Sequence, residues 1–144
     1  MRNMWQRIVR MAALAAGGVA GLFGEWHATL TILVAAMGID YITGVLVAAA
    51  GRSGKTEGGG LSSKAGFIGL AKKGFIMLIV LLATLLDRAV GGADGAKGMV
   101  FQTAACFYYI ANEGLSILEN AARMNIPVPE FIKKRLEALR EGEK

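Results

Sequence analysis

Residues 98–118 read GMVFQTAACFYYIANEGLSIL and contain one charged residue, Glu113. A helix needs about 20 mostly apolar residues to cross the hydrocarbon core of a bilayer, which is about 30 Å thick. This stretch therefore predicts a transmembrane helix over residues 98–120. Three further apolar stretches predict helices of the same kind, over residues 8–24, 28–50 and 72–90.

The composition of the whole chain agrees with a small membrane protein. Of its 144 residues, 54% are hydrophobic and 19% are charged, against about 25% charged in ordinary soluble domains. One Cys and one His allow neither an intramolecular disulfide nor a Cys/His metal cage. We expect an all-α integral membrane protein that needs no cofactor, with a membrane domain over residues 1–128 and a basic cytosolic tail over residues 129–144.

The positions of the basic residues orient the predicted helices. Fourteen of the sixteen Lys and Arg residues lie in three groups: before or at the start of the first helix, between the second helix and the start of the third, and after the fourth. Loops rich in Lys and Arg stay in the cytoplasm, so four spans with both termini inside place all fourteen on one side. We favour this topology, with residues 51–66 as a flexible, Gly-rich cytosolic loop. The alternatives are three spans with the first stretch on the membrane surface, or an N-terminus removed as a signal peptide.

The helix over residues 98–120 carries a continuous polar stripe. At 100° per residue, six side chains fall within about 40° of one line along the helix. These are Gln102, Cys106, Tyr109, Glu113, Ser116 and Asn120. Charged and polar groups at membrane depth are costly unless they meet water or other polar groups. The stripe therefore predicts either a surface that lines a pore or faces another subunit, or the packed interior of a single bundle.

Other positions suggest helix packing and membrane contact. In the second helix, Asp40 and Thr43 share one face and form a thinner polar stripe. Small residues recur every fourth position at Ala13, Gly17 and Gly21, a spacing that lets helices approach closely, although Ala and Gly are common in membrane helices anyway. Basic residues expected at an anionic membrane surface are Lys72, Lys73, Lys133, Lys134, Arg135 and Arg140.

For the tail and for the Gly-rich loop, an interpretation without a binding role competes with a functional one. Residues 130–140 predict a short amphipathic helix that either lies on anionic lipid or is a solvated tail. The loop sequence AAGRSGKT at residues 49–56 resembles a phosphate-binding loop, but no strand precedes it and no βαβ pattern is present. We therefore expect no nucleotide site. The chain also lacks paired catalytic carboxylates and any nucleophile–base pair, so nothing in it suggests an enzyme.

Three blocks of sequence together resemble the phage holin family of the toxin-secretion and phage-lysis type. They are IDYITGVL at residues 39–46, LSSKAGFIGLAKKG at residues 61–74 and YIANEGLSILENAARMNIPVP at residues 109–129. The resemblance implies a protein of the bacterial cytoplasmic membrane that forms homo-oligomers and opens holes at a set time. It implies release of an endolysin or a toxin through the hole, without a stable complex, and it implies no catalytic residues.

Two other classes of protein fit parts of the pattern. A small multidrug transporter also has four short spans, but it uses a membrane-embedded Glu that is commonly in the first span. Here Glu113 lies in the last span. A scaffold subunit of a membrane complex would need no pore. The excess of basic residues is explained by their place on the predicted cytoplasmic side of the membrane. Neither this charge nor any motif indicates binding to nucleic acid.

Overall fold

The computed structural model describes residues 2–91 and 98–142, and every regular element in these ranges is a helix. The prediction of an all-α protein is confirmed for this part of the chain. The helices are α1 (Arg2–Leu22), α2 (Ala28–Ala49), the short 3-10 helix η1 (Glu57–Gly59), α3 (Ser63–Gly91), α4 (Val100–Arg123) and α5 (Glu130–Glu141).

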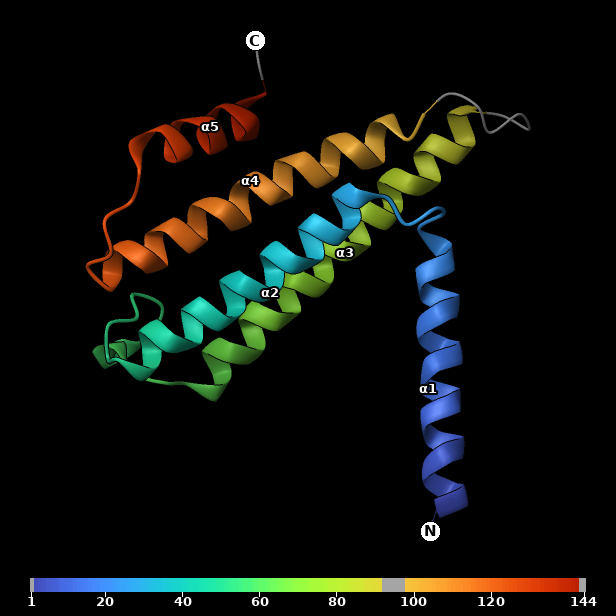
Figure 1. Cartoon of the computed structure of the whole chain (residues 1–144), viewed down its shortest axis with the longest axis horizontal. Coiled ribbons are helices and arrows are strands. Elements are labelled where there is room, and N and C mark those ends of the chain that lie inside the picture. The colour runs from blue at the N-terminus through green and yellow to red at the C-terminus, as the bar shows by residue number, and fades with distance from the viewer. Residues whose placement is uncertain (1, 92–97, 143–144) are drawn as a thin grey trace.

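Three helices, α2, α3 and α4, form a bundle (Figure 1). Within it, α2 and α4 run in the same direction and α3 runs in the opposite one. The last long helix, α4, has the central position, because it contacts α2, α3 and also α5, which folds back along it. The first helix, α1, leaves the bundle at a steep angle, and its residues 3–19 are exposed.

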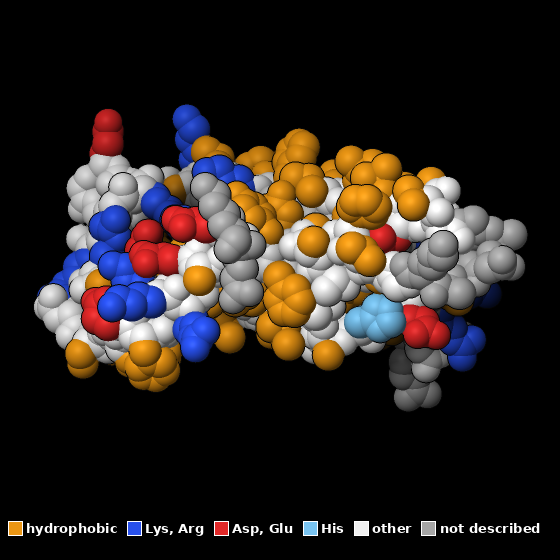
Figure 2. Space-filling view, turned by 90° about the horizontal axis from the view of Figure 1, so that it is seen from above, with side chains coloured by type: hydrophobic (Ala, Val, Ile, Leu, Met, Phe, Trp, Pro, Cys, Tyr) orange, Lys and Arg blue, Asp and Glu red, His pale blue; other side chains and the backbone are white. Residues whose placement is uncertain are grey.

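The bundle exposes many large apolar side chains and buries several polar ones beside its apolar core. Phe75 is 67% exposed, whereas Gln102 is fully buried and Glu113 is 7% exposed. Figure 2 shows hydrophobic side chains over the middle of the molecule and most of the charged ones toward one end. So many large apolar side chains on the outside, with polar ones buried, suit a surrounding of lipid.

Two helices in the described ranges are long and apolar enough to cross a membrane, by length and composition. They are α2 and α3. The polar stripe lowers the mean hydropathy of α4, as Arg7 and Arg10 lower that of α1.

The helix ends differ in part from the sequence predictions. The helix expected over residues 72–90 begins at Ser63, so the Gly-rich connection is shorter than residues 51–66. The side chain of Ser62 accepts a hydrogen bond from the backbone N–H of Ala65 at 3.3 Å, which caps the new first turn.

The Gly-rich connection has its own hydrogen bonds and also contacts the end of α4. Ser53 N–H donates to the carbonyl of Gly59 at 2.9 Å, and the hydroxyl of Thr56 donates to the carbonyl of Gly60 at 2.7 Å. The guanidinium of Arg52 donates to the carbonyl of Arg123 at 3.3 Å. The structure therefore gives a defined shape to a segment expected to be flexible.

A left-handed residue ends α4 and turns the chain back toward α5. Asn125 has φ 61°, and the N–H of Ile126 donates to the carbonyl of Ala121 at 3.0 Å. This is the Schellman pattern, in which the residue after the cap satisfies a free helix carbonyl. Pro127 and Pro129 follow and cannot continue the helix, so the chain reverses and places α5 on α4.

Candidate functional site

The polar stripe of α4 faces the inside of the bundle. Four of its six residues are buried, and the other two, Tyr109 and Ser116, are half-buried. The stripe contacts α2 and α3 of the same chain. This is what the packed-interior interpretation requires, and in this single chain the stripe is not on an outer surface.

A lysine from α3 joins the stripe to α2. The ammonium of Lys73 donates a hydrogen bond to Oδ2 of Asp40 at 2.8 Å and another to Oε2 of Glu113. The three side chains are 9–11% exposed. We call Asp40, Lys73 and Glu113 the charge cluster. Each member comes from a different helix, so the cluster links all three.

Asn120 extends the charge cluster toward the end of α4. Its amide donates to Oδ1 of Asp40 at 3.3 Å and to the hydroxyl of Thr43 at 3.0 Å. The Thr43 hydroxyl in turn donates to the backbone carbonyl of Asp40 at 3.1 Å. The two polar residues predicted on α2 thus contact Asn120 of the α4 stripe directly, and Asp40 is joined to Glu113 through Lys73, although the sequence indicated neither the partners nor the pairing.

A second polar contact lies at the other end of the stripe. The amide of Gln102 donates to the hydroxyl of Thr84 at 2.7 Å and to the backbone carbonyl of Phe23 at 2.9 Å. Its oxygen, Oε1, is buried without a hydrogen-bond partner in the described part of the chain. This contact joins α3, α4 and the α1–α2 connection.

Asp87 of α3 caps the start of α4. Its two carboxylate oxygens accept hydrogen bonds from the backbone N–H groups of Phe101 and Gln102, at 2.9 and 2.8 Å. These N–H groups belong to the first turn of a helix and have no partner within it. A negative charge there also complements the helix dipole, so Asp87 fixes the position of Gln102.

An apolar layer separates the two polar regions. It is formed by Leu33 and Met37 of α2, Val80 of α3 and Cys106 of α4, all buried. Cys106 belongs to the predicted stripe, yet it packs here as a small apolar side chain. The polar path along the stripe is therefore interrupted within this chain.

A cavity of about 280 Å³ lies beside the charge cluster, between α2 and α3. Asp40, Lys73 and Glu113 line it, as do Gly44 and Gly69. The glycines leave space because they have no side chain. The cavity extends toward the Gly-rich connection.

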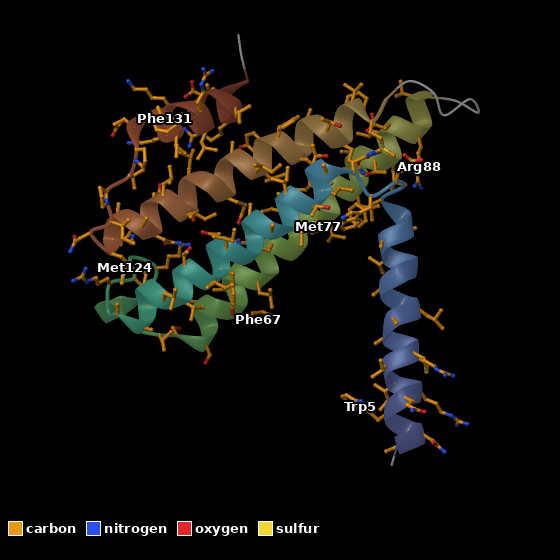
Figure 3. All side chains as sticks on the ribbon, viewed as in Figure 1. Trp5, Phe67, Met77, Arg88, Met124 and Phe131 are labelled. Carbon is orange, nitrogen blue, oxygen red and sulfur yellow. The ribbon has the colours of Figure 1, made fainter. Side chains whose placement is uncertain are left out.

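Within residues 2–91 and 98–142, the small residues of α1 pack against no other helix. A Cβ atom added at Gly17 or Gly21 would meet nothing within 4 Å, and Ala13 is exposed. Figure 3 shows Trp5 on α1, far from the bundle. A packing role for these residues thus needs a partner outside this chain, and it stays a prediction.

Five of the six predicted surface lysines and arginines are exposed, namely Lys72, Lys133, Lys134, Arg135 and Arg140. Lys73 departs from the prediction: its side chain lies inside the bundle, because two buried carboxylates compensate its charge there. On α5, the side chain of Leu136 packs beside Gly114 of α4.

Sequence reasoning missed the roles of Lys73 and Thr84. A signal was available, because Lys73, Val80 and Thr84 are seven and four residues apart and so share one face of a helix. That face is the one that α3 turns toward α4. The sequence pattern instead predicts Lys73 at the membrane surface, together with Lys72.

Residues 17–141 match the model of the bacteriophage holin family. The chain belongs to the bacteriophage holin family. A probable holin of Bacillus phage phi105 is 34% identical over 120 residues, which cover 83% of this chain and 79% of that protein. An uncharacterized protein of Listeria innocua is 40% identical over 127 residues, 88% of this chain and 82% of its own. One of Halalkalibacterium halodurans is 37% identical over 132 residues, 92% and 93% of the two chains.

No solved structure shows a significant match to this member of the holin family. The matched residues include all of α2 to α5 and the last turn and a half of α1. The charge cluster, the Gln102 contact and the cavity therefore all lie within the part of the chain that carries the holin relationship. The resemblance seen in the three sequence blocks is confirmed.

Proposed function

We propose that this protein acts as a holin in the cytoplasmic membrane of a bacterial host. Copies accumulate as homo-oligomers and then open holes through which an endolysin, or a toxin, leaves the cytoplasm without a stable complex. The observation that carries the proposal is the bundle itself, in which an apolar exterior encloses five buried polar residues, Asp40, Thr84, Gln102, Glu113 and Asn120. Family membership supports the same conclusion.

The closed state in this proposal is the bundle of the single chain. Most of its buried polar groups have partners within the chain, so the protein can accumulate in the membrane without conducting. In the open state the α4 stripe leaves α2 and α3 and faces water in an oligomer. Both states provide polar surroundings for the stripe, so they need to differ by only a few kcal/mol.

The proposed topology has four spans with both ends of the chain in the cytoplasm. The Gly-rich connection and the end of α4 lie at one end of the bundle, and the exposed basic residues of α5 lie beside α4. Loops rich in Lys and Arg stay inside. In this arrangement α1 crosses the membrane beside another copy and brings its arginines to the cytoplasmic side, while α5 holds anionic lipid headgroups.

Induced expression with an impermeant dye tests the hole. Glu113→Leu and Gln102→Leu, matched for protein level, should shift the time of dye entry, because each removes a polar group from the stripe. Phe107→Leu is the control, since Phe107 is exposed on the same helix. If both stripe variants admit dye on the schedule of the unsubstituted protein, the stripe does not line the hole. Ion-dependent drug resistance without dye entry would instead indicate a transporter.

Removal of residues 130–144 tests the tail. We expect earlier dye entry, because α5 no longer holds α4 through the contact of Leu136 with Gly114 and no longer binds anionic lipid. Unchanged timing at equal protein level would exclude a role for the tail in the schedule.

A further inference from the structure

The cavity between α2 and α3 reaches from the surface to the charge cluster. Its lining includes exposed residues near the Gly-rich connection, among them Lys55 and Ser62, and buried residues deep in the bundle, Asp40 and Glu113. A volume of about 280 Å³ is far larger than a single water site. The polar groups at its inner end make it suitable for water.

The charge cluster has one more negative than positive group. Lys73 supplies one ammonium against two carboxylates. Asp40 also accepts a hydrogen bond from the amide of Asn120, whereas the hydrogen bond that Glu113 accepts comes from Lys73. Among the described residues no hydrogen bond reaches the second carboxylate oxygen of Glu113, whose side chain is 9% exposed and lines the cavity. An excess charge in such a place is expensive.

The neighbouring charged groups do not remove this excess. The cavity is also lined by Tyr41 of α2, by Lys72 of α3 and by Lys55 of the Gly-rich connection. These three side chains are exposed, so water screens the charges of the two lysines. The charged groups of α5 line a different groove, together with Glu119.

We propose that the cavity is a water-filled vestibule that delivers one proton to the charge cluster. The proton is shared by the carboxyl groups of Asp40 and Glu113, with Lys73 between them, and it makes the buried cluster neutral. Two carboxylates that share a site bind their protons as a pair. The ligand of this site is a proton, and the site exists in each chain whether or not holes form.

Cysteine labelling tests the vestibule in membrane vesicles. Ile76→Cys places a thiol in the cavity lining, and Phe75→Cys places one at nearly the same depth on the outer face, where Phe75 is 67% exposed. A charged, water-soluble thiol reagent should modify the first at least about tenfold faster, because the thiolate reacts and forms only in water. The unsubstituted chain gives the background, since Cys106 is fully buried. Equal rates would overturn the vestibule.

Infrared spectroscopy of the reconstituted protein tests the proton. The unsubstituted protein should show the C=O band of one buried protonated carboxyl at neutral pH. Asp40→Asn and Glu113→Gln should each abolish the band. Each variant keeps one carboxylate and the ammonium of Lys73, so the cluster is already neutral and binds no proton. Lys73→Met should about double it, since both carboxyls must then be protonated to stay neutral. Absence of the band in the unsubstituted protein, or its persistence in either carboxyl variant, would overturn the shared proton. Neither measurement depends on lysis, so a failure here leaves the holin proposal standing.

Discussion

Replacing Lys73 by Met is the sharpest test of what holds the closed bundle together. The ammonium of Lys73 lies 2.8 Å from Oδ2 of Asp40 and also binds Glu113, and all three side chains are 9–11% exposed. Removal of one partner from a buried ion pair costs about 3–5 kcal/mol, whereas an exposed pair contributes about 0–1 kcal/mol. We expect the larger loss, because Met removes the ammonium that binds both buried carboxyl groups, which must then stay charged without a partner or take up protons.

The loss is measured as the free energy of unfolding in mixed detergent micelles, with helix content followed by circular dichroism. A loss of about 3–5 kcal/mol corresponds to about two to three and a half powers of ten in the folding equilibrium. Lys72→Met is the matched control, because the neighbouring lysine is exposed and surface substitutions usually change stability by less than about 0.5 kcal/mol.

A third variant separates electrostatics from packing. Asp40→Asn, Lys73→Met and Glu113→Gln combined should recover most of the stability lost in Lys73→Met, because no unpaired charge is left. If Lys73→Met is no less stable than Lys72→Met, the cluster does not hold the helices together. If the triple variant is as unstable as Lys73→Met alone, the loss comes from packing of the lysine side chain, and the electrostatic reasoning is wrong.

Three further predictions concern the contacts around the bundle. Asp87→Ala should lower the free energy of unfolding by about 1–2 kcal/mol, as loss of a helix cap does. Arg88→Ala, at the same end of α3, is the control and should change it little. Equal effects of the two substitutions would refute the capping role of Asp87. Gly114→Val should release α5, because a Cβ there would lie 2.9 Å from the side chain of Leu136. Proteolysis of the tail should become faster, and adding Leu136→Ala should restore protection in the double variant. An unchanged rate of proteolysis in Gly114→Val would contradict the packing of α5 on α4. Gly17→Ile should leave the stability of the monomer unchanged and weaken cross-linking between copies, and intact cross-linking would exclude the small-residue face as a contact between them.

Much of the fold follows from local patterns. Apolar runs and the prolines after α4 predicted helices close to the observed α2, α4 and α5, because the length of an apolar run and the loss of backbone donors act within one segment. The span expected over residues 72–90 lies within α3, which begins nine residues earlier, at Ser63. There the apolar run begins later than the helix, whose first turn depends on the cap that Ser62 provides.

The candidate site could be predicted only in part. Periodicity placed Gln102, Glu113 and Asn120 on one line of one helix, since a helix repeats its directions every 3.6 residues. It could not identify what faces that line. Lys73 shares a helix face with Thr84, but this spacing does not show which face of α3 is buried. Only the rotation of α3 within the bundle directs Lys73 inward and leaves Lys72 exposed.

By itself, the sequence determined that this is a helical membrane protein of the holin family with a polar stripe on its last long helix. The helices and the stripe depend on the composition and spacing of residues close together in the chain, whereas the family follows from likeness to known sequences. Only the tertiary structure decided that the stripe is buried within one chain, and that a lysine joins two carboxylates from other helices. Such pairings bring together groups 33 and 40 residues apart, and the packing of three helices sets them, because the partners of the buried ammonium lie on other helices.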